Sequence, residues 1–160
     1  MQKRKPIVGI TQGDSNGIGY EVIIKALSDS RVLDFFTPVV YGSSKLFGFY
    51  RKTVPEVEQM DTNAINSASE AHPKRINIVN CLPDSAYAEP GQATAESAGA
   101  AIKSLETAVR ELKEGLIDVL VTGPINKKAI VAEGFGFPGH TEFLQEIGRA
   151  SCRERVLLSV

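Results

Sequence analysis

Short apolar runs alternate with longer amphipathic stretches along most of this chain. Four runs rich in β-branched residues and bounded by turn formers predict buried strands. They are Pro6 to Thr11, Pro38 to Tyr41, Arg75 to Val79 and Ile117 to Thr122. The intervals contain three stretches with helical spacing, residues 19–29, 44–52 and 94–115. The pattern therefore predicts strands and helices in alternation.

The most regular helical stretch is residues 94–115. Its apolar positions recur at steps of four, three, four and three, which places them on one face of a helix. These positions are Ala98, Ile102, Leu105, Val109 and Leu112. Gly115 then provides the expected helix stop.

The alternation of strands and helices favours one fold class. Parallel strands require crossover connections, and helices provide them, so we expect an α/β fold of three layers with a mostly parallel sheet. Ligands of such sheets gather beyond the carboxyl ends of the strands. The loops to inspect therefore follow Thr11 and Thr122, whereas the polar stretch Asp61 to Lys74 is expected to be an exposed connection.

Composition narrows the possible partners. The 160 residues are 42% hydrophobic and carry 18 basic against 19 acidic side chains, a net charge of -1. This balance argues against nucleic acid or an anionic membrane as partner. The chain lacks an apolar run long enough to span a bilayer and a signal-peptide core, so we expect a cytoplasmic protein. Cys81 and Cys152 are interpreted as incidental thiols.

The first candidate loop is Gly13 to Gly19, between a predicted strand and a predicted helix. Free backbone amides at such a junction can receive an anion, and Asp14 and Asn16 add polar side chains. The glycine spacing matches neither the dinucleotide fingerprint nor a Walker loop. The alternative is that the glycines only permit a tight turn.

The second loop, Thr122 to Lys128, contains Pro124, which is well placed to begin a helix. Lys127 and Lys128 can hold a phosphate or carboxylate, or polarise a reacting oxygen. The alternative is that both are solvated charges of a first helical turn.

The third loop, Pro138 to Glu142, contains His140, with Thr141 placed to cap the following helix. A histidine on such a loop can bind substrate or metal or transfer a proton, but a structural hydrogen-bonding role is the alternative. His72 is expected at the surface.

Taken together, "GITQGDSNGIGYE", "VTGPINK" and "GHTEF" resemble the 4-hydroxythreonine-4-phosphate dehydrogenase family of pyridoxal 5′-phosphate biosynthesis. The resemblance covers Met1 to about Glu146. The chain departs from the family pattern at Gln12, Ser15, Asn16 and Tyr20, where the family often has proline, proline, alanine and proline.

The resemblance implies oxidation of a phosphorylated hydroxy-amino acid by NAD or NADP, followed by loss of CO2, with a divalent metal in the full-length family. It also implies a fold similar to isocitrate and isopropylmalate dehydrogenases, working as a homodimer. It assigns His140 and Thr141 to substrate binding, Lys127 as a candidate catalytic residue, and Asp14 and Asn16 as weaker candidates. The resemblance implies that three histidines further downstream hold the metal of the family, so we expect no metal site in this chain. Most nucleotide-binding segments of the family also lie downstream.

From Ile147 onward the sequence resembles the translation of a sequencing adapter. We therefore expect residues 1–146 to be the N-terminal part of the dehydrogenase, residues 147–160 to be a non-native tail, and the truncated chain to be inactive alone. Two alternatives remain open. One is a related dehydrogenase of 4-phosphothreonate or 4-phosphoerythronate, and the other is an α/β module that binds a phosphorylated metabolite without chemistry.

Overall fold

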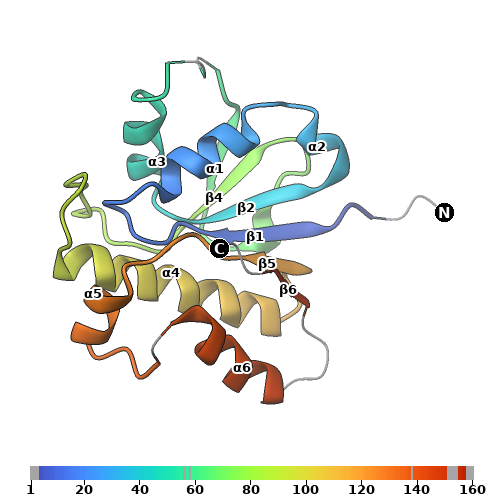
Figure 1. Ribbon diagram of the computed structural model, residues 1–160. Helices are drawn as coiled ribbons and strands as arrows, with labels where there is room; N and C mark the ends of the chain where they lie inside the picture. The colour runs from blue at the N-terminus through green and yellow to red at the C-terminus, as the bar shows by residue number, and fades with distance from the viewer. Residues whose placement is uncertain (1–3, 56, 58, 138, 151–154, 158–160) are drawn as a thin grey trace.

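The computed structural model describes residues 4–55, 57, 59–137, 139–150 and 155–157. These residues form three layers, with one parallel six-stranded sheet between two layers of helices (Figure 1). The order of strands in the sheet is β3-β4-β2-β1-β5-β6. The predicted α/β class with a parallel sheet is therefore confirmed.

The strands are short, and the central ones are buried. Their bounds are β1 Ile7–Thr11, β2 Thr37–Gly42, β3 Thr62–Ile65, β4 Ile76–Asn80, β5 Val119–Val121 and β6 Arg155–Leu157. In register, Val8 lies between Pro38 of β2 and Val119 of β5. This places the ends of β1 and β5 side by side.

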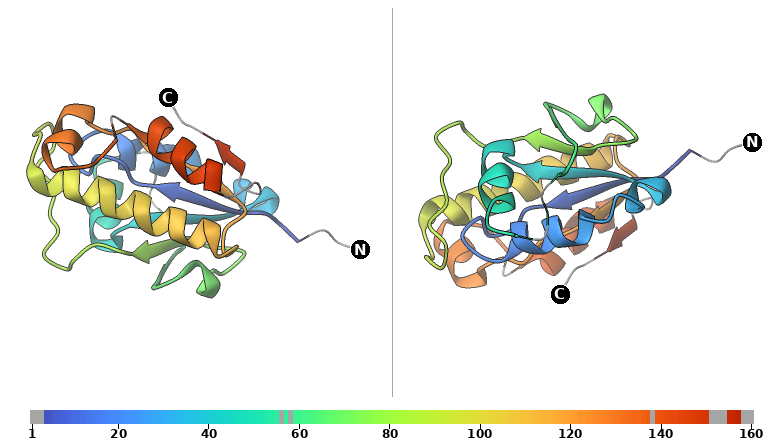
Figure 2. Two further views of the ribbon diagram at one scale, coloured as in Figure 1. Left: turned by 90° about the horizontal axis from the view of Figure 1, so that it is seen from below. Right: turned by 90° about the horizontal axis from the view of Figure 1, so that it is seen from above.

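Helices cover both faces of the sheet, as the two views of Figure 2 show. One face carries α1 Gly19–Leu27, α2 Val32–Phe35 and α3 Ser44–Arg51, and the other carries α4 Ala95–Lys113, α5 Lys127–Ala132 and α6 His140–Ala150. A short 3₁₀ helix, Ala68–Glu70, follows β3.

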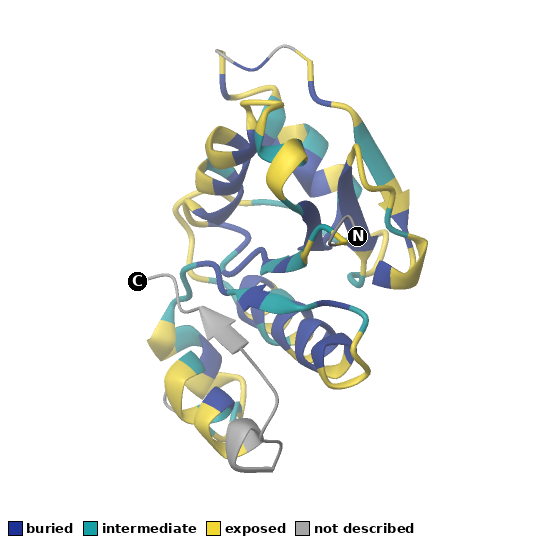
Figure 3. Ribbon diagram, turned by 90° about the vertical axis from the view of Figure 1, so that its right-hand side faces the viewer, coloured by how far each residue is buried: buried dark blue, intermediate teal, exposed yellow. Residues whose placement is uncertain are grey.

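Each helical layer has its own apolar core against the sheet (Figure 3). On the α1 and α3 face, Tyr20, Ile24 and Phe47 are almost fully buried. On the α4 face, Leu105 and Ala108 pack in a cluster with strand residues of the sheet. A smaller cluster joins α4 to α5. The sheet is thus packed on both faces, and the loops of interest leave the ends of its strands.

The structure confirms the four predicted strands and the three predicted helices, with bounds that differ by a few residues. For the longest helix it also confirms the details. Ala98, Leu105, Val109 and Leu112 are buried and Ile102 is half-buried, while Thr94 caps the start by accepting a hydrogen bond from Ser97 N. Gly115 takes a φ of 75°, the left-handed conformation expected after a helix end.

The prediction for Asp61 to Lys74 is wrong in part, because this stretch contains β3 and the 3₁₀ helix. β3 is an edge strand whose residues are mostly exposed or half-buried, so its hydrophobic alternation is weak. Asn77 of β4 holds this edge in place, since its side chain bonds Asn63 and the backbone of His72.

The prediction that residues 147–160 are a non-native tail remains a prediction. In the structure α6 continues to Ala150 and the backbone of Arg155–Leu157 pairs with β5, while residues 151–154 and 158–160 lie outside the described part. No helix in the described residues is long and apolar enough to cross a membrane.

Candidate functional site

The two loops singled out by sequence meet at the point where the order of strands reverses. From β1 the chain passes to β2 on one side, and β5 lies on the other side of β1. A crevice forms at such a switch point because adjacent connections leave in opposite directions. In the structure the first loop spans residues 12–18 and the second loop spans residues 122–126. Both start at the carboxyl ends of these strands, on the left of Figure 1.

Backbone hydrogen bonds hold the two loops together. The amide of Asp14 donates to the carbonyl of Pro124 at 2.8 Å, and the amide of Gly123 donates to the carbonyl and the hydroxyl of Thr11, both at 3.1 Å. Gly13 makes this approach possible. Its φ is +69°, and a Cβ there would lie 2.2 Å from the carbonyl oxygen of Pro124. The loops therefore form one unit, and glycine is required at position 13.

A hollow of about 550 Å³ opens over this junction. We call it the switch-point hollow, and it is lined by Asp14, Gly17, Ile18, Pro124, Ile125, Asn126, Lys127 and Lys128. Its charged groups are one half-buried carboxylate and two exposed ammonium groups. Two lysines suit a phosphate or carboxylate, while Asp14 can accept from a hydroxyl group.

The start of α5 differs from the sequence expectation. The helix begins at Lys127 rather than at Pro124, because Asn126 is its cap and accepts a hydrogen bond from Ala129 N at 3.1 Å. Sequence analysis missed Asn126 as a residue of this hollow. Asparagine just before "KKAI" was the available signal, since it is among the strongest helix-capping residues.

His140 lies beside the second loop. The Cε atom of Lys127 is 3.6 Å from the place that a Cβ would take at Gly139, the neighbour of His140. Burial, and then the positive charge of Lys127, lower the pKa of His140 below its ordinary 6.5. The imidazole is therefore neutral at neutral pH and can accept a hydrogen bond.

The other expected residues occupy different positions. Thr141 is exposed and lies inside α6, which begins at His140, so the expectation that it caps this helix is wrong. Asp14 and Lys127 line one hollow, and Lys127 approaches His140. The structure thus brings Asp14, Lys127 and His140 into one region, with Thr141 next to it in sequence.

Asn16 is used to hold another segment. Its Oδ1 accepts from the amide of Glu89 at 2.8 Å, and its Nδ2 donates to the carbonyl of Gln92 and to the hydroxyl of Thr94. Thr94 caps α4. Asn16 therefore ties the first loop to the start of α4, and its side chain has an evident structural task.

Two of the four residues that depart from the family pattern, Gln12 and Tyr20, contact each other. The Tyr20 hydroxyl bonds the side chain of Gln12 and accepts from the amide of Ser43 at 3.0 Å, and its ring stacks on Tyr50. Burial raises the pKa of Tyr20 far above its usual range, so it stays protonated. Gln12 Nε2 and the hydroxyl of Thr122 are buried without a hydrogen-bond partner among the described residues.

The described residues contain no group of three His, Cys, Asp or Glu side chains that could hold a metal ion. The charged neighbour of His140 is Lys127, whose positive charge repels a metal cation. The described part of this chain therefore does not offer a site that fits the divalent metal implied by the family resemblance.

Comparison with known proteins gives a consistent result. The profile of the family described as "Pyridoxal phosphate biosynthetic protein PdxA" matches residues 34–158. The 4-hydroxythreonine-4-phosphate dehydrogenase of Bacteroides thetaiotaomicron is 47% identical over 146 residues, which are 91% of this chain and 40% of that protein. The D-threonate 4-phosphate dehydrogenase of Cupriavidus necator is 34% identical over 147 residues, 90% of this chain and 43% of that protein.

The fold comparison agrees. The crystal structure of a 4-hydroxythreonine-4-phosphate dehydrogenase from Burkholderia phymatum superposes with a TM-score of 0.81 at 33% identity, over 92% of this chain and 44% of that one. The chain therefore spans less than half the length of these relatives. On the match of the family profile to most of the sequence, the chain belongs to the PdxA family of pyridoxal phosphate biosynthetic proteins.

Proposed function

We propose that this chain is the substrate-binding part of an NAD-dependent dehydrogenase that oxidises 4-phosphohydroxy-L-threonine in pyridoxal 5′-phosphate biosynthesis. The observation that carries the proposal is the meeting of Asp14, Lys127 and Lys128 in one hollow at the switch point of a PdxA-family fold. Two ammonium groups beside one carboxylate match a substrate that carries a phosphate and a hydroxyl group.

Each side chain has a defined role in this proposal. Lys127 and Lys128 bind the phosphate or carboxylate of the substrate, and Asp14 orients a hydroxyl group. His140, neutral because of burial and Lys127, accepts a hydrogen bond from the substrate, and Thr141 adds a hydroxyl next to it. NADP is the alternative cofactor, and in either case the bound nicotinamide supplies the acceptor for the hydride.

The proposal concerns a protein longer than the described residues. The relatives are more than twice as long as the matched segment, so we propose that residues 1–146 act with further structure of the family and that the 160 residues alone are inactive. A cytoplasmic homodimer is part of the proposal. Because the described residues offer no metal site, the metal-assisted loss of CO2 is not assigned to them.

A hybrid enzyme tests the proposal. The 146 residues that match the Bacteroides relative replace the corresponding segment of that enzyme, and reduction of NAD+ is followed with 4-phosphohydroxy-L-threonine. We expect turnover by the hybrid and none by the 160-residue chain. Lys127→Met in the hybrid is expected to raise KM by about tenfold or more, since it removes a charge-assisted contact.

The same assay separates the alternatives. The Cupriavidus necator relative at 34% identity is a D-threonate 4-phosphate dehydrogenase, so a hybrid with higher kcat/KM on D-threonate 4-phosphate would favour that activity. A hybrid that folds and binds either substrate without reducing NAD+ would favour the non-catalytic module. Asn66→Ala, at an exposed position after β3, is the control variant and should leave KM unchanged.

A further inference from the structure

Two stacked tyrosine rings contact the first loop, and the proposed chemistry leaves them without a role. Tyr20 is the second residue of α1, and Tyr50 lies in the last turn of α3, the helix that packs beside α1 (Figure 1). Their ring centroids are 5.4 Å apart and their planes differ by 12°, and both side chains are buried. We call them the tyrosine pair. Burial in an apolar core explains the two rings, whereas the two hydroxyl groups require polar partners.

Both hydroxyl groups of the tyrosine pair bond the first loop. The Tyr50 hydroxyl donates to the backbone carbonyl of Ser15 at 2.5 Å. The Tyr20 hydroxyl bonds the side chain of Gln12, at the start of the loop. The pair therefore holds the loop at two points, one before and one after Asp14.

The backbone of β2 is shaped to accept these contacts. Gly42 ends this strand, and a Cβ at that position would overlap both the Tyr20 hydroxyl and the side chain of Gln12. The next residue, Ser43, donates its amide to the Tyr20 hydroxyl at 3.0 Å. The end of β2 thus fixes the Tyr20 ring, and the ring of Tyr50 stacks on it.

Asp14 is the residue that these contacts position. Its amide donates to the carbonyl of Pro124, and the bond from Tyr50 reaches the carbonyl of the next residue, Ser15. Hydrogen bonds on both sides of one Cα atom restrict the direction of its side chain. The Oδ1 atom of Asp14 accepts from the amide of Asn16 at 3.0 Å. Its Oδ2 atom can accept from a hydroxyl group of a ligand in the switch-point hollow.

The side chains of Asp14 and Tyr50 also interact through charge. Burial, and then the negative charge of Asp14, raise the pKa of Tyr50 above its ordinary value of 10.0. The Tyr50 hydroxyl is therefore protonated at neutral pH and remains a donor to the loop. A carboxylate that affects this hydroxyl lies close to it, so a change at Tyr50 is expected to reach Asp14.

We propose that Tyr50, supported by Tyr20, is a positioning residue for substrate binding, whose bond to Ser15 keeps the Asp14 carboxylate directed at the switch-point hollow. The inference rests on the proposed function, because that function gives Asp14 the task of orienting a substrate hydroxyl group. It deepens the function, since it places a determinant of substrate binding in α3, outside the three loops.

Hydrogen exchange in the 160-residue chain tests the positioning itself. Tyr50→Phe keeps the stacked ring and removes the bond to the loop. We expect the amide of Asp14, which bonds Pro124, to exchange about fivefold faster relative to the amides of β2, a ratio that cancels a general loss of stability. Tyr41→Phe is the matched control and should leave this ratio unchanged. It removes another buried tyrosine hydroxyl, which donates to Glu111 of α4 at 2.6 Å on the other face of the sheet.

A double-mutant cycle in the hybrid enzyme separates positioning from a structural role. Tyr50→Phe should lower kcat/KM for 4-phosphohydroxy-L-threonine by about fivefold, because the Asp14 carboxylate loses its fixed direction. In a hybrid that already carries Asp14→Ala, the same substitution should lower kcat/KM by less than about twofold. A residue that only packs the core would have the same effect in both backgrounds. Tyr41→Phe should leave kcat/KM unchanged in both.

The inference is overturned if the amide of Asp14 exchanges as slowly in Tyr50→Phe as in the parent chain, or if Tyr50→Phe lowers kcat/KM equally in both backgrounds. Its failure is distinguishable from failure of the proposed function. A parent hybrid without turnover removes the function, and the exchange of Asp14 then decides whether Tyr50 positions this loop. An active hybrid with independent effects of Tyr50→Phe and Asp14→Ala removes only the inference.

Discussion

The amide of Asp14 donates a 2.8 Å hydrogen bond to the carbonyl of Pro124, across 110 positions of sequence, and thereby joins the loops that follow β1 and β5. The bond holds the Asp14 carboxylate and Lys127 over one hollow. Since β1 and β5 are adjacent parallel strands, their packing fixes the geometry of the site. Stability of this junction and ligand binding are therefore expected to change together.

Gly13→Ala tests the junction. The substitution places a Cβ 2.2 Å from the carbonyl oxygen of Pro124 and forces a side chain into the left-handed region, so we expect a loss of about 3 kcal/mol of unfolding free energy. Gly115→Ala has a similar φ of +75° but no atom within 4 Å, and should lose only about 1 kcal/mol. Urea unfolding measures both values, and equal losses would show that the close approach contributes nothing.

Thr122→Val tests the unpartnered hydroxyl at the end of β5. The residue is 0% exposed and its hydroxyl has no partner in the described part of the chain, so replacement by a methyl group should stabilise the fold by about 1 kcal/mol. Thr11→Val is the matched control on β1. The Thr11 hydroxyl accepts a bond from Gly123 N, and its removal should destabilise by about 1 kcal/mol. A destabilised Thr122→Val protein would indicate a bound water or ligand group.

His140 predicts a pH dependence of stability. Its folded-state pKa lies below 6.5 because of burial and then Lys127, so the unfolded chain takes up this proton first as the pH falls. The contribution of His140 to the free energy of unfolding is therefore complete above pH 6.5. It is lost as the pH falls toward the lowered folded-state pKa. His140→Gln should show a smaller drop in unfolding free energy than the parent chain between about pH 7.5 and pH 5.5. Identical drops in both proteins would contradict the lowered pKa.

Truncation after Glu146 tests the prediction of a non-native tail. If residues 147–160 are non-native, the fold evolved without them, so their removal should change Tm by less than about 2 °C. A fall in Tm above about 5 °C would show that these residues contribute to the fold. Re-sequencing of the gene after the Glu146 codon is the direct check, and an authentic stop codon after Val160 would refute the prediction.

Sequence patterns predicted the central strands and the long helix because burial there imposes strong periodicity. Ala98, Leu105 and Val109 show the helical repeat, and β2 is buried along its whole length. The edge strand β3 was missed because it is mostly exposed or half-buried, so its polar sequence resembles a loop. Hydrophobic periodicity arises from burial, and an edge strand such as β3 has few buried side chains.

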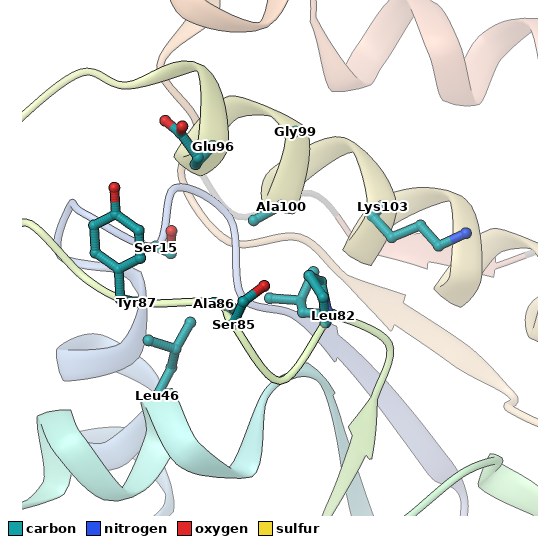
Figure 4. Close-up of a pocket in the computed structure, with 11 residues that line it drawn as sticks. Ser15, Leu46, Leu82, Ser85, Ala86, Tyr87, Glu96, Gly99, Ala100 and Lys103 are labelled. Atoms are coloured by element: carbon teal, nitrogen blue, oxygen red, sulfur yellow. The ribbon is translucent and has the colours of Figure 1, made fainter.

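The site was predictable only in part for a related reason. Motifs indicated the loops around Asp14, Lys127 and His140, but a motif does not give the hydrogen bonds of its side chains. Asn16 was a candidate for the site, and the structure uses its amide to hold residues 89–94. A pocket beside α4, lined by Ser15, Leu46 and Gly99 among others (Figure 4), combines segments far apart in sequence, so its residues carried no local signal.

The most direct test of the central claim is a titration of the 160-residue chain with 4-phosphohydroxy-L-threonine, followed by backbone amide chemical shifts. We predict that the largest changes occur at Asp14, Asn126, Lys127 and His140, around the switch-point hollow. Absence of saturable changes, or changes confined to the opposite edge of the sheet, would contradict the claim that these loops form the substrate site.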